Sequence, residues 1–167
     1  KGVKVSWDLN FPRAQGKYIA LCEGDDYWLD ENRLQRQVDF MEANKDYSIC
    51  FGNVVIKDEN LEKEYLLESY SKLTFTLEHL LEGKNFIHTC TCLFRNGYAD
   101  DIVKNRKIIF GDYYLHLLNA QFGKIKYFDE RFGVYRMHQG GVHGNFTASK
   151  EKKIAGVINH YVFWKEI

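Results

Sequence analysis

The sequence has few of the residues that divide a chain into separate parts. It contains one proline in 167 residues, Pro12, and no Gly/Ser-rich or low-complexity tract of the kind that forms linkers. With 45% hydrophobic residues, a chain of this length can bury one substantial core. We therefore expect residues 1–167 to form a single domain.

The sequence also has a formal net charge of zero and no long apolar run. Lys and Arg together number 23, as do Asp and Glu, so nothing favours electrostatic binding of nucleic acid. No apolar run approaches the roughly 20 residues of a membrane-spanning helix. We expect no nucleic-acid partner and no membrane span in this chain.

Cysteines are few, and they lack the spacing of a metal site. The four of them, at positions 22, 50, 90 and 92, fall in apolar stretches without CxxC pairs or the density of a secreted disulfide scaffold. Cys90 and Cys92 are expected to be small buried strand residues rather than metal ligands. This usage favours a reducing cytoplasm.

Strand-like and helix-like segments alternate, which predicts an α/β domain. The apolar run 18–22 is typical of a strand buried on both faces, as in a parallel or mixed sheet. A helix is expected from Asp30, because Leu34, Val38 and Met41 share one face.

Later elements continue this alternation. Strands are expected at 48–56, 86–95, 125–128 and 132–137, and helices at 76–83, 111–122 and 149–162. The first of these strands would complete an α/β crossover. Gly123 is expected to stop the helix before it. The charge-rich residues 57–72 are expected to form a surface excursion or a partly helical insertion.

The sequence Glu23-Gly24-Asp25-Asp26 directly follows the first expected strand. Open α/β sheets bind ligands outside the carboxyl ends of their strands. A divalent cation neutralises adjacent carboxylates, and phosphates often complete its ligand shell. The cluster therefore indicates a diphosphate ligand, with Tyr27-Trp28 as a wall of its site. A solvated Asp/Gly turn fits the spacing equally well.

Two further segments carry candidate site residues. Asp112 opens an expected helix, where it fits either an N-cap or a carboxylate base that deprotonates an acceptor hydroxyl. Arg136 and His138 stand where a strand runs into the loop of Gly140 and Gly141. Neutral imidazole binds metals and a guanidinium fork binds phosphate, although either residue alone is more typical of an ordinary surface position.

Taken together, these segments resemble the family-2 glycosyltransferases of the GT-A fold, in particular the bacterial enzymes that build surface polysaccharide. Residues 14–20 and 23–28 are similar to that family's passage A-x-G-K-Y-I-A followed by D-G-D-D-Y-W. Residues 110–113, 123–125 and 134–142 follow the order of its C-terminal blocks. Several blocks in order are far more specific than any one of them.

The resemblance implies roles for individual residues. Asp25 would coordinate Mg²⁺ or Mn²⁺ against the diphosphate of a nucleotide-diphospho-sugar donor, with a UDP-sugar as the expected donor. Asp26 would lie beside it, and Glu23 replaces the usual Asp that contacts sugar or ribose. His138 would lie near the metal and Arg136 near the diphosphate. Asp112 falls at the catalytic-base position of these inverting enzymes.

The resemblance also implies a missing part. The family's nucleotide-binding strands should precede Lys1, so we expect the C-terminal portion of a catalytic domain, a partial GT-A fold with little turnover alone. An unpaired sheet edge would invite formation of a homodimer or strand exchange. Residues 37–40 do not match the Gln-x-x-Arg-Trp motif of processive synthases, so transfer of one sugar is expected. The expected acceptor is a glycan or a lipid-linked sugar, at the inner face of the membrane or in the cytoplasm.

Two rival functions remain open at this point. A metal-dependent nucleotidyltransferase or phosphotransferase also places carboxylates at a strand end, but it usually carries an N-terminal Gly-rich phosphate loop, and this sequence shows none. A non-catalytic sugar- or nucleotide-binding module would keep the fold without the activity. Substitution of Asp112 separates an enzyme from a binding module.

Overall fold

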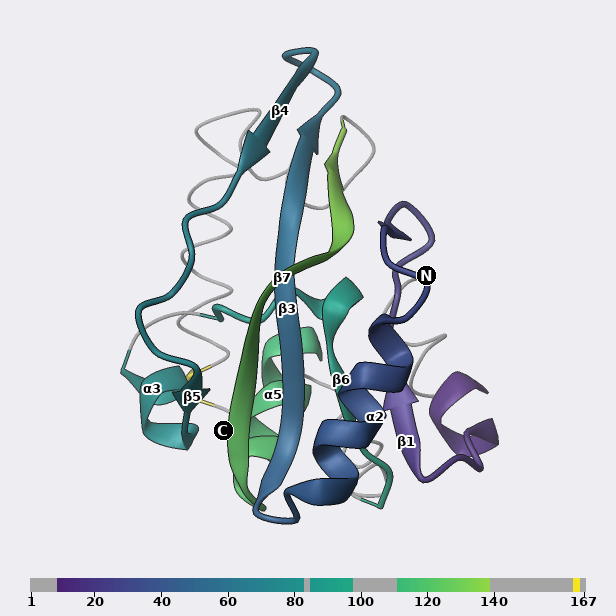
Figure 1. Ribbon diagram of the computed structural model, residues 1–167, viewed down its shortest axis with the longest axis vertical. Coiled ribbons are helices and arrows are strands. Elements are labelled where there is room, and N and C mark those ends of the chain that lie inside the picture. Colours follow the sequence, from purple (N-terminus) through teal and green to yellow (C-terminus); the bar gives the residue numbers. More distant parts are fainter. Residues whose placement is uncertain (1–8, 83–84, 98–110, 139–163, 166–167) are drawn as a thin grey trace.

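The computed structural model describes residues 9–82, 85–97, 111–138 and 164–165. In chain order its elements are η2 (Phe11–Arg13), β1 (Tyr18–Ala20), β2 (Tyr27–Trp28), α2 (Arg33–Ala43), β3 (Tyr47–Asp58), β4 (Lys63–Leu66), β5 (Thr74–Phe75), α3 (Leu77–Leu81), η3 (Thr89–Thr91), β6 (Leu93–Arg95), α5 (Gly111–Ala120) and β7 (Lys124–Met137) (Figure 1). The helix expected at 149–162 lies outside the described residues. Within them, no helix has the length and apolar character needed to cross a membrane.

The described strands form one mixed sheet of seven strands. Its order is β1-β6-β3-β7-β2, with β4 paired to β3 and β5 paired to β7. The long strands β3 and β7 run parallel, side by side (Figure 1). β6 is antiparallel to both β1 and β3, so these two strands point the same way, as the expected crossover through α2 requires. The predicted α/β class with a mixed sheet is confirmed.

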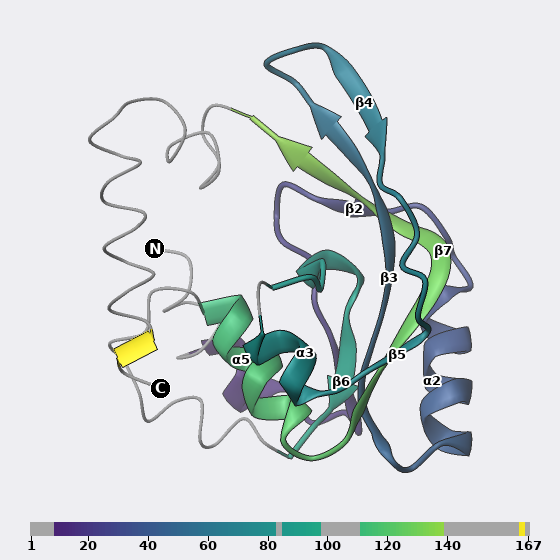
Figure 2. The same cartoon turned by 90° about the vertical axis from the view of Figure 1, so that its left-hand side faces the viewer.

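Helices cover both faces of the sheet, with α2 on one side and α3 and α5 on the other (Figure 2). Successive residues of β3 therefore enter different parts of the core. Ile49 and Phe51 belong to the cluster that includes α5 residues, whereas Cys50 packs with Met41 of α2. All four side chains are fully buried. Burial on both faces explains the apolar character of β3. The same expectation is wrong for the run 18–22, because β1 lies at the end of the strand order and only Ile19 of its three residues is buried.

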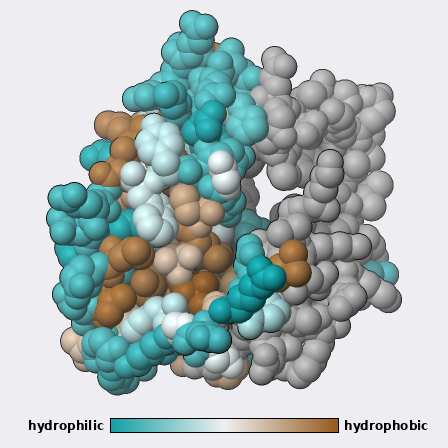
Figure 3. All heavy atoms as spheres, turned by 90° about the vertical axis from the view of Figure 1, so that its right-hand side faces the viewer, coloured by the Kyte–Doolittle hydropathy of each residue, from teal (hydrophilic) through white to brown (hydrophobic). Residues whose placement is uncertain are grey.

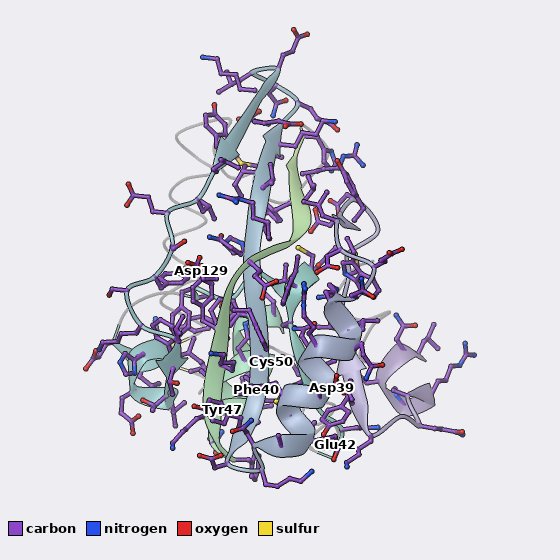
Figure 4. The ribbon with its side chains drawn as sticks, viewed as in Figure 1. Asp39, Phe40, Glu42, Tyr47, Cys50 and Asp129 are labelled. Atoms are coloured by element: carbon purple, nitrogen blue, oxygen red, sulfur yellow. The ribbon has the colours of Figure 1, made fainter. Side chains whose placement is uncertain are left out.

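Phe40 fixes α2 to the sheet. Its ring meets Tyr47 and Phe128 edge-on, with centroid distances of 4.9 and 5.6 Å. Figure 4 shows Phe40 on the side of α2 toward Tyr47, with Asp39 and Glu42 on the opposite side. The helix has the amphipathic arrangement that the sequence predicts.

Several expected elements differ from those in the structure. α2 begins at Arg33 rather than after Asp30, because the Asp30 carboxylate instead accepts a hydrogen bond from the Asn32 backbone N–H at 2.8 Å. The surface excursion or partly helical insertion expected at residues 57–72 includes β4, which pairs antiparallel with β3, so the excursion is a strand rather than a helix. β4 is exposed throughout, and Figure 3 shows hydrophilic atoms over that end of the molecule.

The strand expected at 86–95 is reduced to β6, because the chain first makes the 3-10 turn η3. Thr91 causes this departure: its hydroxyl donates to the Gly52 carbonyl at 2.9 Å and accepts from the Gly52 N–H at 3.3 Å. The turn therefore joins the centre of β3 through a side chain instead of through strand pairing. Cys90, in the middle of η3, lies near Glu23 and Asp26, which follow β1.

The break expected at residues 129–131 is a bulge within one strand. Gly52 pairs with Phe128 and Asn53 with Arg131, so the intervening residues are left out of the ladder. Beyond the bulge, the Phe132 ring lies on Gly52, where a Cβ atom would come within 2.3 Å of it. The glycine makes room for this fully buried ring.

Gly123 allows the backbone to pass close to Asp46 and does not end the helix. α5 ends at Ala120, and a Cβ atom on Gly123 would lie 2.7 Å from the Asp46 carbonyl oxygen. Phe122, expected on the buried face of the helix, follows its end and is 51% exposed.

Candidate active site

The acidic turn, residues 23–26, joins β1 to β2. It is closed by a hydrogen bond from the Asp26 N–H to the Glu23 carbonyl at 3.1 Å. β2 then pairs antiparallel with β7, with Trp28 opposite Gly133 and Tyr27 opposite Val134. This short pairing brings the acidic turn beside the end of β7, which holds the second predicted group of site residues.

Three contacts hold the acidic turn to this strand end. The Arg136 backbone N–H donates to the Asp26 carboxylate at 2.9 Å, and the Arg136 guanidinium donates to the Asp25 carbonyl at 3.0 Å. His138 Nε2 lies 3.1 Å from Asp25 Oδ2. The structure therefore brings together four of the predicted residues from distant parts of the sequence.

The rest of the Arg136 guanidinium is bonded to Glu59, in the turn between β3 and β4. Nε and Nη2 donate to one Glu59 carboxylate oxygen, at 2.8 and 2.6 Å. This partner raises the pKa of Arg136. Arg136 thus holds the acidic turn in place through hydrogen bonds to Asp25 and Asp26. Its contact with a phosphate stays a prediction. Nothing in the charge-rich segment 57–72 distinguishes Glu59 from its acidic neighbours.

Glu23 is surrounded by negative charge. Burial by nearby protein atoms raises its pKa to about 7, and Asp26, Asp112 and Asp25 add to the rise. The side chain still reaches solvent. A carboxyl group so placed is stabilised by a bound proton or a cation.

Cys90 joins this group, although its sequence context predicts only packing. Ligand atoms of Glu23, Asp26 and Cys90 all lie within 4.8 Å of one another. Burial raises the pKa of the Cys90 thiol, and its hydrogen bond with Asp26 favours the charged form of that carboxyl. Without a bound cation, the thiol stays protonated at neutral pH and its hydrogen bond is to Asp26.

Asp112 lies on a different element, and its charge adds to the rise in the pKa of Glu23. It occupies the first turn of α5 and is exposed. The pKa of Tyr135 is raised to about 12, mainly by burial and further by the negative charges of four nearby carboxylates: Asp26, Asp25, Glu23 and Asp112. Because α5 already includes the preceding Gly111, the N-cap interpretation of Asp112 is wrong.

The donor set suits a hard divalent cation. Asp25 Oδ2 and His138 Nε2 lie at a hydrogen-bond distance of 3.1 Å, which is also close to the roughly 3 Å between two adjacent ligands of an octahedral Mg²⁺ with bonds of about 2.1 Å. Burial and the charge of Asp25 raise the pKa of Asp26, although Arg136 and Cys90 oppose this. A cation at Asp25 would relieve that repulsion.

Tyr27 and Trp28 directly follow the acidic turn, and both are exposed. The Trp28 indole N–H donates to the Cys90 carbonyl at 2.8 Å, and the buried Arg33 guanidinium lies 3.9 Å from the Trp28 ring centroid. Trp28 is thus fixed on one side and accessible on the other. Its role as a wall for a ligand stays a prediction.

Comparisons with known proteins place the chain among its relatives. An uncharacterised protein of Mycobacterium tuberculosis and one of Mycobacterium bovis are each 34% identical to it over 150 residues, covering 87% of this chain and 42% of the relative. An uncharacterised glycosyltransferase of Methanocaldococcus jannaschii is 27% identical over 167 positions, covering 91% of this chain and 57% of the relative. The chain thus spans about half the length of these relatives.

A family match covers the acidic turn as well. Residues 2–103 match Glycosyl transferase family 2. This region includes Glu23, Asp25 and Asp26, whereas Asp112, Arg136 and His138 follow it and reach the same site through β7 and α5. The chain belongs to glycosyl transferase family 2.

Proposed function

We propose that this chain forms the metal- and acceptor-binding part of an inverting glycosyltransferase, which moves a sugar from a nucleotide-diphospho-sugar to an acceptor hydroxyl. The observation that carries the proposal is the contact of Asp25 with His138. It joins the acidic turn to the end of β7 and leaves two ligand atoms at the spacing of an octahedral cation. Asp112 lies close enough to raise the pKa of Glu23.

In the proposed reaction, Asp112 accepts the proton of the acceptor hydroxyl. The hydroxyl oxygen attacks the anomeric carbon as the bond from that carbon to the diphosphate oxygen breaks, and the electron pair leaves with the diphosphate. Attack opposite the leaving group inverts the configuration. Mg²⁺ or Mn²⁺ held by Asp25 and His138 would supply positive charge beside the diphosphate. Arg136 keeps the acidic turn in position.

Finer assignments follow the resemblance and are part of the proposal. The donor is a UDP-sugar, the acceptor is a glycan or a lipid-linked sugar, and the product is a cell-surface polysaccharide built from the cytoplasmic side. One sugar is transferred per reaction. This last point follows from residues 37–40, which do not match the Gln-x-x-Arg-Trp motif of processive synthases.

Assembly is also proposed rather than observed. Within the described residues β1 pairs with β6 along one edge, which leaves the other edge for a preceding strand or a second copy of the chain. The assignment of residues 1–167 to one domain is likewise a prediction.

Asp112→Asn in the full-length gene product tests the proposal. Turnover should fall at least about 100-fold, as expected for loss of a general base, while the Kd for the donor stays unchanged. Asp39→Asn is the matched control, since Asp39 is exposed on α2 and bonded to Gln35. Undiminished turnover would refute the assigned base, and unchanged donor binding without any turnover in the natural protein would favour the binding module. Release of pyrophosphate instead of a nucleoside diphosphate would favour the nucleotidyltransferase.

A further inference from the structure

The Asn85 side chain lies between Asp112 and the buried His116, which are both on α5. Its Nδ2 donates to Asp112 Oδ2 at 3.2 Å, and its Oδ1 lies 2.9 Å from His116 Nδ1. Asp112 and His116 are four residues apart on α5, so they lie on one face of the helix. One asparagine side chain from outside the helix therefore contacts both.

The orientation of the Asn85 amide is fixed by partners whose roles are unambiguous. The Ile87 backbone N–H can only donate, and it bonds Asn85 Oδ1 at 3.3 Å. A carboxylate of Asp112 can only accept, so it takes the hydrogen bond from Nδ2. Asn85 therefore presents its oxygen to His116, and His116 Nδ1 must carry the hydrogen.

The environment of His116 agrees with this tautomer. The ring is fully buried, and burial lowers its pKa to about 4, so at neutral pH it carries a single N–H. With that hydrogen on Nδ1, Nε2 is left as an acceptor. Among the described residues, Nε2 has no hydrogen-bond partner. The bond from Nδ1 to Asn85 is thus the polar contact that the structure gives this ring.

We propose that Asn85 and His116 are positioning residues for the proposed base Asp112. His116 fixes the Asn85 amide through one hydrogen bond, and Asn85 fixes Oδ2 of the Asp112 carboxylate through another. Oδ1 of Asp112 is then left to take the proton from the hydroxyl of the sugar acceptor. This inference rests on the proposed function of Asp112. An exposed carboxylate in a first helical turn has several staggered rotamers, and misplacement of a reacting group by about 1 Å can lower a rate about 100-fold.

Three variants of the full-length gene product test the chain of hydrogen bonds. Asn85→Ala and His116→Leu should each lower kcat about 10- to 100-fold and leave the Kd for the donor within about twofold. His116→Asn should restore most of the loss relative to His116→Leu, because its amide N–H is as many bonds from Cα as Nδ1–H. Asn119→Ala is the control for damage to α5, since Asn119 is buried there and its side chain donates only to the Leu115 carbonyl within the described residues. It should keep its kcat.

A second readout does not depend on activity. Long-range ¹H–¹⁵N NMR spectra of the natural protein should show the Nδ1–H tautomer for His116, and Asn85→Ala should shift it toward Nε2–H. An Nε2–H tautomer in the natural protein would overturn the proposal, as would His116→Asn with a kcat as low as that of His116→Leu. If Asp112→Asn abolishes turnover but Asn85→Ala does not, positioning is refuted while the proposed function stands. If Asp112→Asn has no effect, the proposed base and its positioning fail together.

Discussion

His138 Nε2 and Asp25 Oδ2 lie 3.1 Å apart although 113 positions separate the two residues in the sequence. The contact exists because the two residues of β2 pair with β7 directly beyond the acidic turn. The same pairing sets Arg136 against the Asp25 carbonyl. A strand pair of two residues thus determines the geometry of the whole candidate metal site.

Arg136→Lys should weaken metal-dependent donor binding. One guanidinium bonds the Asp25 carbonyl and Glu59 at once, and a lysine ammonium lacks this planar fork. We expect an increase of about fivefold in the Kd for the donor, from the loss of charge-assisted hydrogen bonds. Glu59→Gln should give a smaller increase in calorimetric titrations. Glu64→Gln, an exposed acid on β4, is the control, and an equal effect there would show that only net charge matters.

Gly52→Ala should destabilise the fold. A Cβ atom at this position would meet the Phe132 ring at 2.3 Å, and the ring is fully buried, so it has no free space to enter. Overpacking of this kind typically lowers the free energy of unfolding by about 1–3 kcal/mol. Urea denaturation of Gly52→Ala and Gly24→Ala measures the difference, because a Cβ atom on Gly24 meets nothing within 4 Å. Equal stabilities would contradict the packing of Phe132 on β3.

Acid should lower the stability of the folded protein through the buried His116 and the half-buried His88. Burial lowers the pKa of His116 and of His88 from 6.5 to about 4. Between these values the unfolded chain binds protons at these two side chains that the folded chain does not, so their contribution to stability is complete above pH 6.5 and falls as the pH drops toward 4. Glu23, whose pKa is raised to about 7, contributes in the opposite direction. Each histidine contributes a slope of at most about 1.4 kcal/mol per pH unit.

The contribution of His116 to the pH dependence of stability is the difference between the natural protein and the His116→Asn variant. Urea denaturation at several pH values between 7 and 4 should show a steeper loss of stability for the natural protein than for His116→Asn. Parallel curves for the two proteins would mean that the pKa of His116 is the same in the folded and unfolded states.

Thiol labelling should distinguish Cys22 from the other cysteines. Cys22 is exposed, whereas Cys50, Cys90 and Cys92 are buried, and all four are free. Partial burial and the charge of Asp26 raise the pKa of Cys22, so its thiolate is scarce at neutral pH. The native protein should therefore react with an aromatic disulfide reagent at one thiol, more slowly than free cysteine, and at four thiols in denaturant. Rapid labelling of a second thiol in the native protein would contradict the buried position of Cys90.

Local patterns predict much of this fold. The helix face of Leu34, Val38 and Met41 and the buried strand at 48–56 have counterparts in the structure, because hydrophobic periodicity reports burial directly. The run 18–22 predicts the strand β1, although only Ile19 of that strand is buried. The position of the acidic turn at the end of β1 follows from the same pattern.

Contacts set by long-range pairing have no such local signal. Residues 86–95 have the composition of a strand, but the Thr91 hydroxyl bonds Gly52 and the chain forms η3 instead. Glu59 and Asn85 are ordinary polar residues until β7 and α5 place Arg136 and Asp112 beside them. Side-chain partners of this kind depend on the complete sheet, which a linear pattern does not contain.

The most direct measurement is calorimetric titration of the full-length gene product with a panel of UDP-, GDP- and dTDP-sugars, with and without Mn²⁺, beside the Asp25→Asn variant. Asparagine keeps the size of Asp25 and removes its charge, so the variant isolates the carboxylate. We expect one class of nucleotide sugar to bind only when Mn²⁺ is present, and Asp25→Asn to abolish that binding. Metal-independent binding, or equal binding by Asp25→Asn, would contradict the metal site formed by the acidic turn and His138.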